Sequence, residues 1–272
     1  MTQRRKFIVP YLVGGAVGLA CAFVQAGTSC QARSSPQQTT LVELYTSEGC
    51  NSCPPADRWL SSLKSRPDVL AAAFHVDYWD RLGWKDRFAD PRYTQRQAEG
   101  QLRSGAKFSY TPQVLVNGRD WRRWPELPAK AMPASVLIEL QREDDGRIAV
   151  RVVPTAAAPP RLGLWWVLLE DGHVSAVKAG ENAGVRLRHD HVARAYGQRA
   201  AWRRDDTSAW MLELPLKAKG ARGDMGGPQA GLADAAGTHT RLADEVGPKA
   251  RLLVVVTDAS SGAPLQAVQL SC

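Results

Sequence analysis

Two cysteines carry the strongest chemical pattern in the sequence. The stretch TSEGCNSCPPADRW places Cys50 and Cys53 three residues apart, after an apolar segment and before a helical pattern. Pro54 and Pro55 fit only the first turn of a helix, so we expect the pair at a helix N-terminus. The dipole and free amides there favour a thiolate. The pattern predicts thiol–disulfide exchange in which Cys50 reacts first and Cys53 resolves the mixed disulfide.

Other interpretations of the pair stay open. Exported proteins use disulfides as structural links, so Cys50 and Cys53 could form one of these. A zinc site needs four ligands, and the chain has a single C-x-x-C motif. Soft thiolates select Cu(I), so the two cysteines, with His75 as a third ligand, form a copper-binding hypothesis.

Two further groups could bind a ligand. His75, Asp77 and Trp79 alternate onto one face if the strand before them continues. They predict either a groove beside the cysteines or a loop packed by its own aromatic residues. His189 and His191 would share a strand face as a metal pair, although neighbouring arginines disfavour a cation.

The first residues have the pattern of an export signal. A basic start is followed by an apolar stretch from Phe7 to Val24 and by a small-residue cleavage pattern that ends at Ala26. We therefore expect a signal peptide over residues 1–26, a periplasmic or secreted protein, and no stable membrane span after cleavage. A membrane anchor, a lipoprotein at Cys21, and the choice between twin-arginine and general export stay open.

Export also determines how the remaining cysteines are interpreted. Cys21 would leave with the signal peptide, and Cys30, Cys50, Cys53 and Cys272 would remain. An even number of cysteines in an oxidising compartment predicts disulfides. Once the C-x-x-C pair is joined, Cys30 and Cys272 are left for a structural disulfide.

Composition limits the class of protein. The 272 residues are 44% hydrophobic and 23% charged, which is enough for two modest cores. The net charge of +8 falls to about +5 without the three basic residues of the signal peptide (8 minus 3). The arginines of the mature chain are interspersed with acids, as on a solvated surface, so we expect no nucleic-acid binding. No motif predicts a cofactor.

The pattern of elements changes near Trp124. Before it we expect strands at 40–45, 68–78 and 113–116, helices at 54–65 and 86–103, and a hairpin turn at Asn117-Gly118. After it we expect strands at 136–140, 148–153, 164–169, 174–177, 209–214 and 252–257. Residues 27–39 form a polar leader arm, and 217–249 a Gly/Ala-rich loop. This order predicts an α/β unit followed by a β-sandwich.

The first unit resembles thioredoxin-like proteins. The resemblance is carried by the C-x-x-C between strand and helix and by Thr111-Pro112 at the start of a later strand. It implies that Pro112 is cis and lies against the cysteine pair. It also implies that the Thr111 backbone binds an extended segment of a partner. The site residues expected on this basis are Cys50, Cys53, Thr111 and Pro112.

A narrower resemblance covers nearly all of the mature chain. The blocks VELYTSEGCNSCPPAD, FHVDYWDRLGWKDRFADP, YTPQVLVNGR and GENAGVRLRHDHV resemble the exported bacterial family called domain of unknown function 1223. The family implies a secreted thioredoxin-like fold without an established substrate. Asn51-Ser52 leaves the redox direction open. Glu43 lies one residue further from the first cysteine than the buried acid of thioredoxins.

These observations give one expectation and one alternative. We expect an α/β thioredoxin-like domain over residues 40–130 followed by an all-β sandwich-like domain over 134–272. The expected activity is thiol–disulfide exchange with a periplasmic protein or a small thiol. The alternative is a non-enzymatic binding module, for a protein or Cu(I), with a structural 50–53 disulfide.

Overall fold

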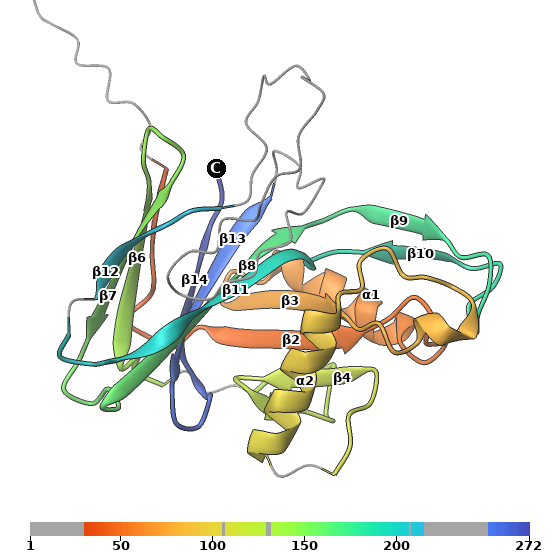
Figure 1. Ribbon diagram of the computed structural model, residues 1–272, viewed down its shortest axis with the longest axis horizontal. Helices are drawn as coiled ribbons and strands as arrows, with labels where there is room; N and C mark the ends of the chain where they lie inside the picture. Colours follow the sequence, from red (N-terminus) through yellow and green to blue (C-terminus); the bar gives the residue numbers. More distant parts are fainter. Residues whose placement is uncertain (1–29, 105–106, 129–131, 207, 215–249) are drawn as a thin grey trace, which may run out of the picture.

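The computed structural model describes residues 30–104, 107–128, 132–206, 208–214 and 250–272 (Figure 1). Strands make up 44% of these residues and helices 14%. The predicted signal peptide and the predicted Gly/Ala-rich loop lie outside the described residues. Neither α-helix in the described part is long and apolar enough to cross a bilayer.

The elements follow one another with short connections. The first half contains β1 (Gln31–Arg33), β2 (Thr40–Thr46), α1 (Pro54–Ser62), η1 (Leu63–Ser65), β3 (Val69–His75), η2 (Asp80–Leu82), α2 (Pro91–Ser104), β4 (Gln113–Val116) and β5 (Arg119–Asp120). The second half contains β6 (Val136–Arg142), β7 (Ile148–Pro154), β8 (Arg161–Glu170), β9 (His173–Ala176), β10 (Arg186–His189), β11 (Val192–Arg203), β12 (Ala209–Leu212), β13 (Arg251–Asp258) and β14 (Pro264–Leu270).

One large sheet contains strands from both halves of the chain. Its eight strands lie in the order β14-β13-β8-β11-β3-β2-β4-β5. The halves meet where β11 pairs in parallel with β3, with Val192 opposite Ala73 and the Ala73 amide donating to the His191 carbonyl at 2.8 Å. The predicted fold class, an α/β thioredoxin-like domain followed by an all-β sandwich-like domain, is therefore wrong. The protein is mostly β-sheet, and the sequence of β11, VARAYGQRAAWR, lacks the apolar alternation that would have predicted this strand.

The two α-helices cover opposite faces of the large sheet. Neighbouring residues of a strand point to opposite faces, and the side chains of β2 divide accordingly. Val42 and Leu44 pack with Ala56 and Leu60 of α1. Leu41 and Tyr45, by contrast, share a buried cluster with Tyr93 of α2. Figure 1 shows α2 crossing in front of β2 and β3, with α1 behind them.

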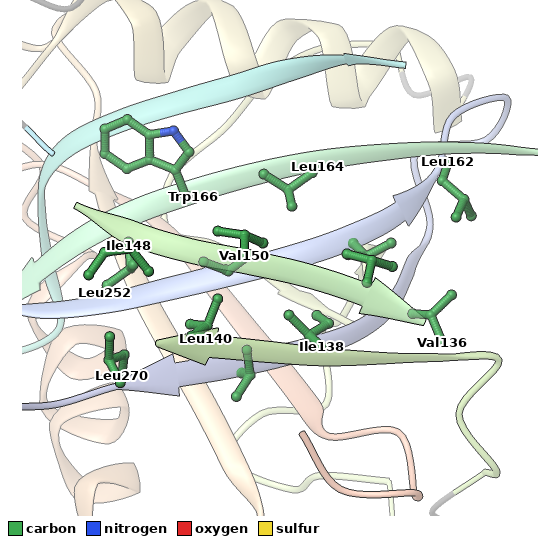
Figure 2. Close-up of a cluster of buried hydrophobic side chains, with 14 of the residues drawn as sticks. Val136, Ile138, Leu140, Ile148, Val150, Leu162, Leu164, Trp166, Leu252 and Leu270 are labelled. Carbon is green, nitrogen blue, oxygen red and sulfur yellow. The ribbon is translucent and has the colours of Figure 1, made fainter. Parts of the chain in front are cut away.

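A second sheet packs against the far end of the first. Its order is β1-β6-β7-β12, and its inner face meets β8, β13 and β14. Figure 2 shows the buried apolar side chains of this interface pointing into the space between the strands of the two sheets. Each fully buried Val, Leu or Ile stabilises the fold by roughly 1.5–3 kcal/mol relative to exposure. The interface includes Val136, Ile138, Leu140, Ile148, Val150, Leu162, Leu164, Trp166, Leu252 and Leu270.

The beginning and the end of the described chain are joined. A disulfide links Cys30 to Cys272, whose Cα atoms are 5.9 Å apart. Directly after Cys30, β1 pairs antiparallel with β6. The Gln266 side chain donates to the carbonyls of Ser35 and Gln37 at 2.6 and 3.0 Å. The described part of the segment expected to be a polar leader arm, residues 30–39, is thus attached to both sheets.

Removing the Cys30–Cys272 disulfide should lower the free energy of unfolding. The chain-entropy model gives about 4–5 kcal/mol for so long a loop, an upper bound for the double substitution Cys30→Ala/Cys272→Ala. Urea denaturation of oxidised protein measures the loss, with exposed Ser271→Ala as the matched control. Unchanged stability, or free thiols at both positions in non-reducing peptide maps, would contradict the bridge.

A substitution at Gly197 tests whether β11 packs on β8 in the large sheet. A Cβ added at Gly197 would lie 2.6–2.7 Å from the indole of Trp166, which is buried between the two sheets. Gly197→Ala should therefore lower the free energy of unfolding by about 1–3 kcal/mol, as overpacking does. Gly100→Ala in α2 is the control, because its Cβ meets nothing closer than 4.0 Å and should stabilise by up to about 1 kcal/mol. Equal effects in urea denaturation would contradict the packing of β11 on β8.

Candidate functional site

The cysteine pair lies at the carboxyl end of β2, where β2 leads into α1. Cys50 and Cys53 are joined by a disulfide, with their Cα atoms 5.5 Å apart. Cys53 is the N-cap of α1, and Pro54 and Pro55 occupy its first turn. The Cys53 amide donates to the Cys50 carbonyl at 3.2 Å, which closes a turn between the two cysteines. The position expected from the two prolines is therefore confirmed.

The disulfide is sealed from solvent. Cys50 and Cys53 have no exposed surface, while Asn51 and Ser52 between them are exposed. The first-turn amides cannot stabilise a thiolate as the sequence suggested, because proline carries no amide hydrogen. The dipole of α1 remains, and the Ser52 hydroxyl lies 3.4 Å from the Cys50 sulfur. These two features favour a thiolate at Cys50.

A hairpin arm contacts the cysteine turn. Strands β9 and β10 form a separate two-stranded sheet that continues β8 and β11 beyond the large sheet and lies near α1 (Figure 1). At its tip, the Asn182 amide group donates to the carbonyls of Glu48 and Cys50 at 2.8 and 3.0 Å. The Asn51 amide donates to the Glu181 carboxylate at 3.1 Å. Both residues lie in the block GENAGVRLRHDHV, but no local pattern identified them as contacts of the cysteine turn.

Four ionisable side chains form a buried cluster near the cysteine turn. This acid–imidazole cluster consists of Glu48, His75, Asp86 and His189, each at most 2% exposed. His75 Nδ1 lies 2.7 Å from Asp86 Oδ2, and His189 Nε2 lies 3.2 Å from Glu48 Oε1. The two imidazole ring centroids are 5.0 Å apart. Trp84 donates from its indole to Glu48 Oε2 at 2.7 Å.

Three members of the acid–imidazole cluster have pKa values shifted toward the charged form. Burial alone would lower the pKa of His75, but the Asp86 carboxylate holds that pKa above its usual value. Burial would raise the pKa of Asp86, and His75 together with backbone amides holds it below the usual range. The pKa of Glu48 is likewise lowered against the effect of burial, through His189, Ser175 and Trp84. Such shifts occur in functional sites and in structural ion pairs alike.

A fifth buried ionisable side chain follows the pair along the helix. Asp57 is four residues after Cys53, so the two share one face of α1. Asp57 is buried, accepts a hydrogen bond from the Thr46 hydroxyl at 3.1 Å, and has a pKa raised by burial. Glu43, the acid considered from the sequence, instead forms an ion pair with Arg96 at 2.5 Å, on the α2 side of the sheet. The four-residue spacing between Cys53 and Asp57 is the sequence signal that could have identified Asp57.

The Thr111–Pro112 peptide bond is cis. Thr111 is connected to the cysteine turn through Trp79, whose indole donates to the Thr111 hydroxyl at 2.8 Å. A Cβ added at Gly49, next to Cys50, would lie 3.0 Å from the Cβ of Trp79. Trp79 thus packs on the backbone before the pair and also reaches Thr111. The structure thus brings Thr111 and the residue before Cys50 into contact with the same tryptophan.

The candidate metal ligands are dispersed. His189 belongs to the acid–imidazole cluster, whereas His191 lies in the bend before β11 with φ of 57°, its amide bonded to the Asp171 carboxylate at 2.7 Å. The two imidazoles therefore do not share a strand face. Among the residues that the structure describes, no group of three or more His, Cys, Asp or Glu side chains is arranged to hold a metal ion.

Asp57→Asn should stabilise the protein at neutral pH. A carboxyl whose pKa is raised on folding makes the folded state less stable above that pKa, and the effect vanishes once both states are protonated. We expect a gain of about 1 kcal/mol near neutral pH that disappears as the pH falls below the usual carboxyl pKa of about 4. Urea denaturation across this range measures the gain, with exposed Asp144→Asn as the control. A loss at every pH would show that the Thr46 hydrogen bond outweighs the cost of burying the charge.

Comparison with solved structures gives two similar folds. A crystal structure of a protein from Agrobacterium tumefaciens is 21% identical, with a TM-score of 0.55 over 85% of this chain and 93% of that one. HBP35 of Porphyromonas gingivalis is 14% identical, with a TM-score of 0.50 over 88% of this chain and 76% of that one. At these identities the likeness concerns the fold alone. A comparison with curated proteins gives no match.

The sequence also matches a family model. The model of the family described as "Protein of unknown function (DUF1223)" covers residues 41–226. That range contains the cysteine pair, the acid–imidazole cluster, Thr111-Pro112 and the tip of the arm. The family resemblance expected from the four sequence blocks is confirmed, and this chain belongs to the DUF1223 family.

Proposed function

We propose that the protein carries out thiol–disulfide exchange through Cys50 and Cys53. The observation that supports this most is the position of the disulfide at the N-terminus of α1, with buried Glu48 two residues before Cys50 and buried Asp57 four residues after Cys53. Buried ionisable groups are costly to place inside a protein, and functional sites are one place where they gather. Side chains of this kind near a disulfide can donate and accept the protons that exchange requires.

The proposed exchange conserves atoms and electrons. A partner thiolate attacks the Cys50 sulfur, a new S–S bond forms, and the Cys50–Cys53 bond breaks. The electron pair of the broken bond goes to the Cys53 sulfur, which then takes a proton. We assign this proton transfer to Asp57, which shares the helix face with Cys53 and has a raised pKa. When a second partner thiol resolves the mixed disulfide, this sequence oxidises a dithiol partner, and the reverse sequence reduces a partner disulfide.

The compartment and the partner belong to the same proposal. A signal peptide over residues 1–26 would deliver the chain to an oxidising compartment, where the Cys30–Cys272 disulfide can form. The partner would then be a periplasmic thiol or disulfide protein, or a small thiol. The reacting groups all come from the chain and the partner.

One observation favours a second function. Because both sulfurs are fully buried, the 50–53 disulfide could serve as a structural link in a non-enzymatic module that binds a protein partner. In that case the arm would be a permanent cover. Trapping experiments separate the two functions.

Single cysteine substitutions should behave differently. Cys53→Ser leaves the Cys50 thiol without its resolving partner, so mixed disulfides with partners should accumulate. Cys50→Ser should trap few or none, since Cys53 is capped by the packed first turn of α1. Non-reducing electrophoresis and mass spectrometry of cell extracts measure the difference. Cys30→Ser is the control for any adventitious free thiol.

Two outcomes would decide against exchange. Equal trapping by Cys53→Ser and Cys50→Ser would show unspecific thiol reactivity. No trapping by either, with the same fold by circular dichroism, would indicate a structural disulfide and support the binding module.

A further inference from the structure

The tip of the arm contacts the cysteine turn through the hydrogen-bonding groups of a peptide. The Asn182 side-chain amide is a donor to two backbone carbonyls, those of Glu48 and Cys50. The Glu181 carboxylate is an acceptor for the backbone amide of Asn51. One donor group and one acceptor group, presented side by side to the backbone, are also what one residue of an extended segment offers, because its N–H and C=O point to the same side.

The tip is a compact turn that could lift without disturbing the sheet. Gly180 and Gly184 have φ of 73° and 85°, in the left-handed region that favours glycine. The turn is closed by its own backbone, with the Gly184 amide donating to Val177 at 2.9 Å and the Val185 amide to Asn182 at 3.0 Å. Its hydrogen bonds to the cysteine turn are the three made by Asn182 and Glu181.

The seated tip also opposes the chemistry of the pair. Neither sulfur is exposed while it is in place. In addition, the Glu181 carboxylate is bonded to the residue next to Cys50, and its negative charge repels a thiolate that approaches the Cys50 sulfur. Lifting the tip would remove this charge from the path of the attacking thiolate.

We propose that the 180–184 tip occupies the place of the substrate, and that the substrate is an extended, cysteine-containing polypeptide segment that replaces it. The segment's amide hydrogens take over the carbonyls of Glu48 and Cys50, and one of its carbonyls takes over the Asn51 amide. The segment's thiolate then attacks the Cys50 sulfur, and the electron pair of the broken S–S bond goes to Cys53, as described above. This inference rests on the proposed function and names its substrate class.

The test uses the oxidised full-length protein and measures the rate of reduction of the 50–53 disulfide. Three thiols are compared: mercaptoethanol, a blocked pentapeptide with a central cysteine, and the same peptide N-methylated at the amides beside that cysteine. The variants are Asn182→Ala and Asn182→Asp, which keeps the side chain's size. Arg186→Ala, an exposed residue of the same arm, is the matched control, and the Cys30–Cys272 disulfide is the internal reference.

We expect both Asn182 variants to speed reduction by mercaptoethanol about tenfold, since two hydrogen bonds of the tip are lost. The peptide should then react about tenfold faster than its N-methylated form, which cannot donate. Arg186→Ala and the reference disulfide should not change. Unchanged rates in both Asn182 variants would overturn the inference that the tip seals the site. Equal rates for the peptide and its N-methylated form would overturn the peptide substrate.

These failures differ from a failure of the proposed function. If the 50–53 disulfide exchanges readily with every thiol in every variant, only the inference about the tip is lost. If it resists all three thiols even in the Asn182 variants, while Cys30–Cys272 is reduced, the exchange function itself is lost.

Discussion

The parallel pairing of β11 with β3 is the constraint on which the rest of the structure depends. It is short, with Val192 opposite Ala73, yet it joins the strands of the second half to β2, β3 and β4. It also fixes where the hairpin arm goes. Because β10 leads directly into β11, the arm must project past the end of the sheet at which β2 and β3 finish. The cysteine pair follows β2 at that same end, so the arm covers it.

Buried polar contacts join the two halves on both faces of the sheet. On the α2 side, Arg96 forms an ion pair with Glu43 and lies over the rings of Phe74, Trp165 and Tyr196, which come from both halves of the chain. On the other side, the acid–imidazole cluster joins His189 of the arm to Glu48 beside the cysteines. Breaking one partner of a buried pair leaves an uncompensated charge and costs about 3–5 kcal/mol. The two clusters therefore hold the halves in one arrangement.

In the function that we propose, the arm controls access to the cysteine pair. The C-x-x-C at a helix N-terminus would by itself be an accessible exchange site. In this protein Asn182 and Glu181, at the tip of the arm, are hydrogen-bonded to the cysteine turn. His189, at the end of β10, belongs to the acid–imidazole cluster and lies beside Glu48. All three residues lie within residues 41–226, the range that the DUF1223 family model matches. The proposed exchange and the proposed cover thus belong to one structural unit.

The sequence by itself determined the local features. Prolines after Cys53 predicted the start of α1, apolar runs predicted β2, β3, β4 and most later strands, and counting cysteines predicted the Cys30–Cys272 disulfide present in the structure. These depend on neighbours along the chain. Tertiary structure alone decided the fold class, the role of Asn182, and the separation of His189 from His191. Each depends on β11 lying beside β3, a contact between segments far apart in sequence. Parallel pairing leaves no local pattern, because its hydrogen bonds are made by backbone groups that every residue carries.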